Sequence, residues 1–520
     1  MDKEFPLDTD HFVMPDTVVE LQALVKRLFE HIAKRDAVIE SQQAQIHQLQ
    51  RIVFGRRSEK MQRKQEADEE AQDHPGDREA GAASGTGPKT PSNKGHHSTG
   101  RQRRDNLPRE RVEHDLLDAE KVCSCGSPLC KIGEEITEQI EYCPASFKII
   151  EHVRFKYGCM ACAEGVTLAP LPPQPIDKGL AGPGLLAHIL VSKYTDYQPL
   201  YRLEKIFKRH GVTIARSTQC GWVGACAQLL KAIYLGMKDE AVTAPQMHTD
   251  DTPAPTLKPG LGRTLTGRMW IYIACFLNGR RIVIYDYKTD RSSEGPLAFL
   301  KRFVGYLQAD AYAGYDACYK LYKIIEIACW AHARRKFYEI SKRIKKRGIA
   351  HQALEFIGKL YAIEKKVRDM SHDERKQIRQ IESAPILEEF KGWLDTQKAI
   401  VPPAGALGQA IQYVLNHWIA FNNYLLEGWL NIDNNLGERG MRVIAMGRKN
   451  YMFFGSEVGG ENAAIICSLI ESCILNGVEP FEYLRDVLTR LPTHLNKDLA
   501  ELFPYNWKVL QEEKLKAKAA

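Results

Sequence analysis

Apolar residues recur at alternating three- and four-residue spacings near the start of the chain. The first position of each heptad is branched and apolar, at Val18, Val25, Ile32, Ile39, Ile46 and Val53. The fourth position holds leucine at Leu21, Leu28 and Leu49. Arg35 and Gln42 interrupt this second series. Because β-branched first positions with leucine at the fourth favour parallel two-stranded coiled coils, we predict a dimerisation helix within residues 1–61. An amphipathic helix packed on its own chain is the alternative.

The apolar pattern then stops. Residues 62–108 are first acidic, then rich in Gly, Ser, Thr and Pro, and finally basic. Such a segment cannot bury enough apolar surface to offset the entropy lost on ordering, so we predict a disordered linker.

Two cysteine pairs mark the next segment, residues 109–172. The pairs flank a strand-like alternating stretch, and their members are Cys123, Cys125, Cys159 and Cys162. Four thiolates in two pairs suit tetrahedral structural zinc, so we predict a small zinc-ribbon-like module. The alternative is a set of buried free thiols.

Helical periodicity dominates residues 173–245. Two helical stretches, PLYRLEKIFKRHG and RSTQCGWVGACAQLLKAIY, are separated by a short turn at Gly211. This pattern is compatible with a helix-turn-helix whose recognition helix starts at Arg216, which would make Arg216 a DNA contact. An ordinary helical hairpin fits the spacing equally well.

Strand patterns begin at residue 246. A strand ending at Asp250 and Asp251 is followed by a hairpin, RMWIYIACFL and RIVIYDYKT, then a helix, a strand into Asp310, another strand and a basic helix. This order, with aspartates on the first and fourth strands, is the ribonuclease H-like order. Neighbouring strands can bring two sequence-distant carboxylates to one edge, although a single aspartate is more often a turn residue.

The core pattern is then interrupted and resumed. Residues 246–345 would form its first part, residues 346–425 a helical insertion, residues 426–460 its second part, and residues 461–520 a helical tail. The second part carries Glu438 on a short helix that Asn434 or Asn435 can cap and Gly447 can end. A solvated helix with a surface ion pair is the plain alternative.

The composition limits the partners and the compartment that this multidomain α+β protein can have. The 520 residues carry a formal net charge of +7, which is compatible with a nucleic-acid partner without requiring one. The longest apolar run is far shorter than a membrane span, and the acidic N-terminus lacks a secretory signal. Thirteen cysteines without such a signal favour reduced thiols or a metal site, so we expect a cytoplasmic protein without a membrane partner.

The ordered series of motifs resembles one known family. It comprises FGRRSEK, KYGCMAC, LYRLEKIFKRHGVTIARST, HTDDTP, LQADAYAGY, CWAHARRKF, IDNNLGERGMRVIAMGRKNYMFFGS and NAAIICSLIESCILNGVEP. Over nearly its whole length the chain is similar to bacterial transposases of the insertion sequence 66 family. The resemblance implies a DDE-type transposase with a ribonuclease H-like core, whose catalytic carboxylates are Asp250, Asp310 and Glu438. The family motif often has Glu where this chain has Asp251.

The implied chemistry is phosphoryl transfer on double-stranded DNA, with two Mg²⁺ ions held by the three carboxylates. Basic side chains near them would contact phosphates: Arg334, Arg335, Arg439, Arg442, Arg448 and Lys449. His332 is a candidate for the rim of the site. The protein would act as a homodimer or a higher oligomer, and the family often encodes small accessory proteins.

Three other interpretations stay open at this point. They are a non-catalytic zinc-containing DNA-binding regulator, a ribonuclease H-like nuclease that cuts without joining strands, and a coiled-coil scaffold. A transposase should lose activity when Asp310 is substituted, whereas a regulator should not. It should join strands from pre-cut ends, whereas a nuclease should not. It should bind DNA in a salt-dependent way, whereas a scaffold should not.

Overall fold

The computed structural model describes residues 146–158, 166–258, 260, 262–343 and 346–519. The predicted coiled coil and linker lie outside these residues, as do the four cysteines of the predicted zinc site. On either side of residues 159–165 in the sequence, a short antiparallel pair is described, β1 (Lys156–Gly158) with β2 (Val166–Leu168).

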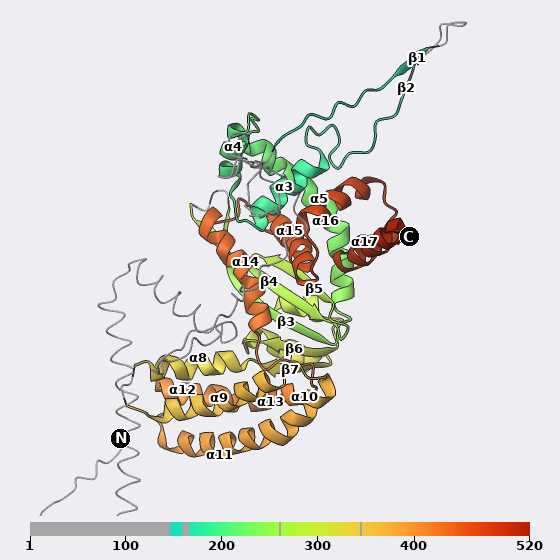
Figure 1. The fold of residues 1–520 in the computed structure, drawn as a ribbon. Coiled ribbons are helices and arrows are strands. Elements are labelled where there is room, and N and C mark those ends of the chain that lie inside the picture. Colours follow the sequence, from blue (N-terminus) through green and yellow to red (C-terminus); the bar gives the residue numbers. More distant parts are fainter. Residues whose placement is uncertain (1–145, 159–165, 259, 261, 344–345, 520) are drawn as a thin grey trace, which may run out of the picture. The chain divides into compact units, whose positions relative to one another are not determined.

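A five-stranded mixed sheet forms the centre of the described chain (Figure 1). Its strands are β3 (Gln246–Leu257), β4 (Thr264–Cys275), β5 (Arg281–Lys288), β6 (Gly305–Ala309) and β7 (Ile324–Ala328). The spatial order is β5-β4-β3-β6-β7. The first three strands pair antiparallel, whereas β6 runs parallel to both β3 and β7. The predicted hairpin is therefore confirmed as β4 and β5, and the predicted order of strands is observed.

The predicted end of the first strand is wrong. β3 continues for six residues beyond Asp251, through Pro253 and Pro255, to Leu257. Proline lacks an N–H, so it is tolerated only where a strand has no ladder bond to donate. Leu257 donates its N–H away from β4, to the carbonyl of Phe454. The two prolines lie two and four residues before Leu257, so their backbone nitrogens face the same side of the strand. The missing donors thus face away from β4, on a side where β6 pairs with β3 only up to His248.

One edge of the sheet is covered by a helix that satisfies its backbone. α15 (Glu457–Leu475) and the residue after it present Ser468, Ser472 and Asn476 to β5. These side chains accept the N–H groups of Tyr285, Val283 and Arg281 at 2.8, 2.9 and 3.1 Å. Four helical residues rise about 6 Å and two strand residues about 6.8 Å, so the two spacings match. The edge therefore cannot pair with another strand.

The opposite edge lies against the helical insertion. β7 contacts α13 (Trp418–Asn422), and Asn423, the first residue of a following 3-10 turn (Asn423–Leu425), donates to the carbonyl of Glu326 at 2.8 Å. The insertion also contains α9 (Ile349–Lys366), α10 (His372–Ile378), a π-helical turn (Arg379–Ser383), α11 (Ala384–Ile400) and α12 (Ala406–Asn416). α9, α11, α12 and α13 enclose a second hydrophobic core together with α8 (Trp330–Ser341).

The helices predicted before the sheet are observed as α3 (Pro183–Tyr194), α4 (Leu200–Arg209) and α5 (Arg216–Ala241). Two short helices, α6 (Glu294–Leu300) and α7 (Asp316–Leu321), lie between the strands. α16 (Pro480–Arg490) and α17 (Pro504–Ala519) complete the helical tail. α3, α5, α15 and α16 share one hydrophobic core with the sheet.

Two of the described helices, α5 and α15, are long and apolar enough to cross a membrane. They contact each other and β5, and α15 is buried along most of its length. Packing inside a protein core accounts for their composition, so they do not indicate a membrane protein.

Candidate active site

The register of β3 and β6 places two predicted carboxylates, Asp250 and Asp310, at equivalent positions along neighbouring strands. His248 pairs with Gln308 across the parallel ladder. Asp250 and Asp310 each lie two residues further along, so both belong to the same face of the sheet. Asp310 is the first residue after β6, and the next residue, Ala311, has a left-handed backbone (φ 60°). The chain therefore turns immediately after presenting Asp310.

Glu438 comes from α14 (Asn435–Tyr451), which packs on β3 and β4. Gly440 makes this close approach possible, because a Cβ there would collide with the side chain of Ile271 on β4. Tyr285 of β5 donates its hydroxyl to the carbonyl of Gly440 at 2.6 Å. Glu438 lies in the first turn of the helix, where the macrodipole favours a negative charge.

The pKa of Asp250 responds to the charges of other carboxylates. This pKa is raised to about 7, chiefly by burial; a backbone hydrogen bond from Asp251 lowers it, and the charges of Asp310, Glu438 and Asp251 make smaller contributions that raise it. Like charges that raise a carboxyl pKa must lie close, because water screens distant ones. The charges of Asp310 and Glu438 therefore act on Asp250, and these three side chains are here called the electrostatic cluster.

A buried polar network fixes the start of α14 over the sheet. His248 contacts the side-chain oxygen of Asn434 at 2.9 Å and the side-chain nitrogen of Asn431 at 3.2 Å. The Asn434 amide also donates to the carbonyl of Thr249 at 2.8 Å, and Gln308 donates to the carbonyl of Asn431 at 2.9 Å. Burial lowers the pKa of His248 to about 4, so the ring is neutral. The network places Glu438 relative to Asp250.

Sequence patterns alone missed this network and misjudged two helix-end signals. Asn434 occupies the N-cap position, but its side chain bonds β3 instead of capping the helix. Gly447 does not end the helix, which continues to Tyr451. A Cβ at Gly447 would meet the Tyr451 ring, so the glycine serves packing within the helix. The i, i+2 spacing of His248 and Asp250 on one strand was the signal available beforehand.

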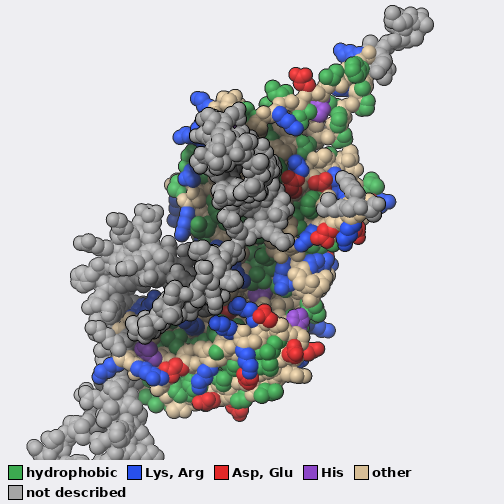
Figure 2. Space-filling view, viewed as in Figure 1, with side chains coloured by type: hydrophobic (Ala, Val, Ile, Leu, Met, Phe, Trp, Pro, Cys, Tyr) green, Lys and Arg blue, Asp and Glu red, His purple; other side chains and the backbone are tan. Residues whose placement is uncertain are grey.

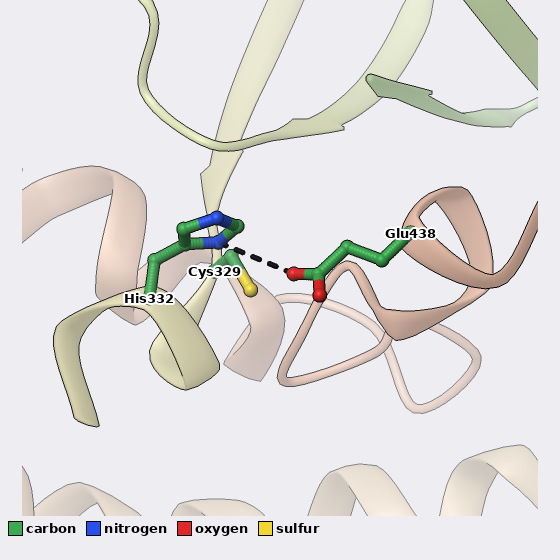
Figure 3. A group of neighbouring side chains, drawn as sticks. All are labelled: Cys329, His332 and Glu438. Atoms are coloured by element: carbon green, nitrogen blue, oxygen red, sulfur yellow. Dashed lines mark ion pairs between the residues drawn. The ribbon is translucent and has the colours of Figure 1, made fainter. Parts of the chain in front are cut away.

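Cys329, His332 and Glu438 form a compact group (Figure 3). One potential ligand atom of each lies within 4.8 Å of the others, and His332 Nδ1 is 3.5 Å from a Glu438 oxygen. Burial lowers the pKa of His332, which favours the neutral ring. His332 therefore contacts the proposed ligand Glu438, and its place at the rim of the site stays a prediction.

Cys329 lies in the protein interior. Burial raises the pKa of its thiol above the ordinary value. Its sulfur also accepts the backbone N–H of Asn434 at 3.1 Å, which is a further tie to the start of α14. The oxygen donors of Asp250, Asp310 and Glu438 match the preference of Mg²⁺.

Asp251 lies in a different environment from its neighbour. Its carboxylate accepts from Arg268 at 2.9 Å and from Arg291 at 2.7 and 3.1 Å, and it is only 3% exposed. Two guanidinium groups compensate its charge, whereas Asp250 faces other carboxylates.

The predicted phosphate contacts fall into two groups. Most are exposed on α5, α8 or α14, namely Arg216, Arg334, Arg335, Arg439, Arg442 and Lys449. On the face drawn in Figure 2, Lys and Arg side chains gather along the edge that carries α4 and α14. Arg335 also lies 3.7 Å from a Glu438 oxygen. Arg448 differs, because its guanidinium donates to Thr252 at 3.0 Å and to the carbonyl of Pro253, which joins α14 to β3.

The first turn of α5 is exposed at Arg216, Ser217 and Thr218, and its contact with DNA stays a prediction. Gln219 is buried and donates to the carbonyl of Ile214 at 3.0 Å, so it holds the preceding turn.

The helical insertion contacts the segments that carry two of the carboxylates. Tyr413 of α12 donates to the carbonyl of Asp310 at 3.2 Å. Tyr361 of α9 donates at 3.0 Å to Asp433, which precedes α14. Arg379, fully buried in the π-helical turn, pairs with Glu364 and donates to three carbonyls of the loop before α14: Tyr424, Glu427 and Leu430. The insertion thus supports the site from the side of β7.

Family models match most of the chain. The model described as "Transposase IS66 family" matches residues 178–462, and the IS66 C-terminal element matches residues 468–505. The "zinc-finger binding domain of transposase IS66" matches residues 120–163, which include all four predicted zinc ligands. The model described as "Transposase C of IS166 homeodomain" matches residues 41–112.

Curated relatives come from Sinorhizobium fredii (strain NBRC 101917 / NGR234). Uncharacterized protein y4hP is 34% identical over 425 residues, covering 78% of this chain and 76% of the relative. Uncharacterized protein y4jD is 34% identical over 424 residues, covering 78% and 82%. With the family models, these matches show that the chain belongs to the IS66 transposase family.

Proposed function

We propose that this protein is a DDE transposase that cuts and joins DNA strands at the ends of an insertion sequence. The observation that carries the proposal is the electrostatic cluster of Asp250, Asp310 and Glu438, three carboxylates from β3, the end of β6 and α14. Clustered carboxylates repel one another, so the arrangement is stable in its charged form only with a compensating cation. The ribonuclease H-like strand order supports the same proposal.

The three carboxylates would hold two Mg²⁺ ions, which supply activation of the attacking hydroxyl and stabilisation of the leaving oxygen. His332 orients Glu438 through its 3.5 Å contact, and the His248 network keeps α14 on the sheet. In the first step water attacks a phosphodiester at the element end and releases a 3′-hydroxyl. In the second step that hydroxyl attacks target DNA.

The remaining parts of the chain would bind and organise DNA. Exposed basic residues on α8 and α14 neutralise phosphates beside the carboxylates, and Arg216 at the start of α5 approaches the duplex. Cys123, Cys125, Cys159 and Cys162 would hold a structural zinc ion within the matched zinc-finger segment. The predicted coiled coil would pair two protomers, so that both element ends are held in one cytoplasmic complex.

Strand cleavage and joining on element-end DNA with Mg²⁺ tests the proposal. We expect the wild type to do both, and Asp250→Asn, Asp310→Asn and Glu438→Gln to do neither while still binding DNA. Cleavage without joining of pre-cut ends would instead indicate a nuclease. DNA binding with unchanged activity in the Asp310→Asn variant would indicate a regulator.

A further inference from the structure

Two adjacent acidic residues on β3 face opposite sides of the sheet. Asp250 belongs to the carboxylate cluster, while Asp251 accepts three hydrogen bonds from Arg268 and Arg291. A carboxylate that is 3% exposed and bound by two cations is not free to bind a metal ion. We therefore look for the role of Asp251 in the two arginines that it binds.

Arg291 is fixed at both ends. Its guanidinium binds Asp251 and lies over the ring of Tyr312, 4.1 Å from the centroid. Its carbonyl accepts the Tyr312 hydroxyl at 2.7 Å. The Tyr312 ring also packs against Trp270 and Tyr315. Arg291 and Tyr312 thus hold each other in one orientation against the sheet.

Tyr312 is in turn bound to the second carboxylate of the cluster. Its backbone N–H donates to Asp310 Oδ1 at 3.1 Å, across the left-handed residue Ala311. A hydrogen bond to one carboxylate oxygen restricts the rotation of that side chain and leaves the other oxygen directed elsewhere. A continuous series of contacts therefore joins Asp251 to Asp310 through Arg291 and Tyr312.

We propose that Asp251 is a positioning residue for Asp310. By holding Arg291 against Tyr312 it fixes the turn of residues 310–312, so that Asp310 is presented to Asp250 before any cation binds. This inference rests on the proposed function, because it assigns the second aspartate of the pair a part in building the metal site. The paired aspartates would then have separate tasks, one binding the cation and the other orienting a ligand.

Titration of the purified full chain with Mn²⁺, followed by electron paramagnetic resonance, tests this without DNA. We expect Asp251→Asn to raise the half-saturating Mn²⁺ concentration about 10- to 100-fold, as substitutions behind a metal ligand do. Arg291→Gln should produce the same shift, although it leaves Asp251 paired with Arg268. Tyr312→Phe should produce a smaller shift, because it removes the hydroxyl and keeps the ring.

The matched control is Asp286→Asn. Asp286 lies on β5 of the same sheet and pairs with Lys238 at 3.6 Å and Lys288 at 3.3 Å. It should change thermal stability without changing Mn²⁺ binding. Wild-type Mn²⁺ affinity in both Asp251→Asn and Arg291→Gln, or an equal shift in Asp286→Asn, would overturn the proposal. A wild type that binds Mn²⁺ and cuts no DNA refutes the proposed function alone.

Discussion

The sheet is joined to two helices, α14 and α15, and the two junctions use polar side chains differently. At α15, Ser468, Ser472 and Asn476 bind backbone groups of the edge strand β5. At α14, Asn434 binds both a side chain and the backbone of the central strand β3. The first arrangement replaces a missing strand. The second orients α14, which carries the proposed ligand Glu438. Polar atoms at this junction therefore set the orientation of the helix and also contribute to stability.

The two junctions should differ most in how substitutions on their helices affect DNA cleavage, and a substitution on α14 should have the largest effect. Glu438→Gln removes a proposed metal ligand and keeps the shape of the side chain. We expect strand cleavage to fall by at least about 10²-fold with little change in thermal stability. Cleavage rates at saturating Mg²⁺, with melting temperature as the control, measure this effect. Full activity in this variant would rule out the proposed trio.

Asn434→Ala should affect both activity and stability. It leaves Nδ1 of His248 and the carbonyl of Thr249 without the Asn434 side chain, which costs about 1–3 kcal/mol for each unsatisfied group, while Nε2 of His248 keeps its contact with Asn431. Because the start of α14 loses its orientation, cleavage should fall even at temperatures where the chain is folded. Chemical unfolding and cleavage assays at low temperature separate the two effects, and a purely structural role would leave the second unchanged.

Glu471 gives the α15 junction a dependence on pH. Burial raises its pKa to about 7 from an ordinary value of 4.5. The folded chain thus binds the proton more tightly than the unfolded chain. The stability contribution is full below pH 4.5 and is lost as the pH rises to about 7 and above. The total is about 3 kcal/mol.

Glu471→Gln should therefore raise the melting temperature at pH 8 and leave it nearly unchanged at pH 4.5. Melting curves of the wild type and the variant at both values measure the difference. An equal change at both pH values would show that the effect does not arise from ionisation.

Ser472→Ala should have the smallest effect on activity. It leaves the N–H and carbonyl of Val283 without their side-chain partner, at a cost of about 1–3 kcal/mol in unfolding free energy for each group. Mn²⁺ binding and cleavage should stay at wild-type levels when the chain is folded. A loss of cleavage comparable with that of Asn434→Ala would erase the distinction between the two junctions.

Much of the fold follows from local patterns. The alternation of β4 and β5 around a tight turn and the spacing of helices before residue 246 predict the observed elements. The course of β3 does not follow, because prolines are tolerated there only on account of which side of the strand lacks a partner. Likewise a glycine such as Gly447 is a common signal for the end of a helix. Only its close packing against Tyr451 shows that this glycine serves the interior of the helix.

The candidate site shows the same division. Asp250, Asp310 and Glu438 were named from the resemblance and stay a prediction, and the charges of Asp310 and Glu438 contribute to the raised pKa of Asp250. The parts played by His248, Asn434 and Arg291 depend on contacts between residues far apart in sequence. Such contacts leave no periodic signal, so they become visible only when the chain is folded.

The five hydrogen bonds of buried Arg379 have a practical consequence for dissecting this protein. Removing the insertion to obtain a minimal catalytic fragment would take away the support of the loop that leads into α14. Such a fragment would keep every proposed metal ligand and still be expected to lose its activity. Mapping studies should therefore use point substitutions in the intact chain.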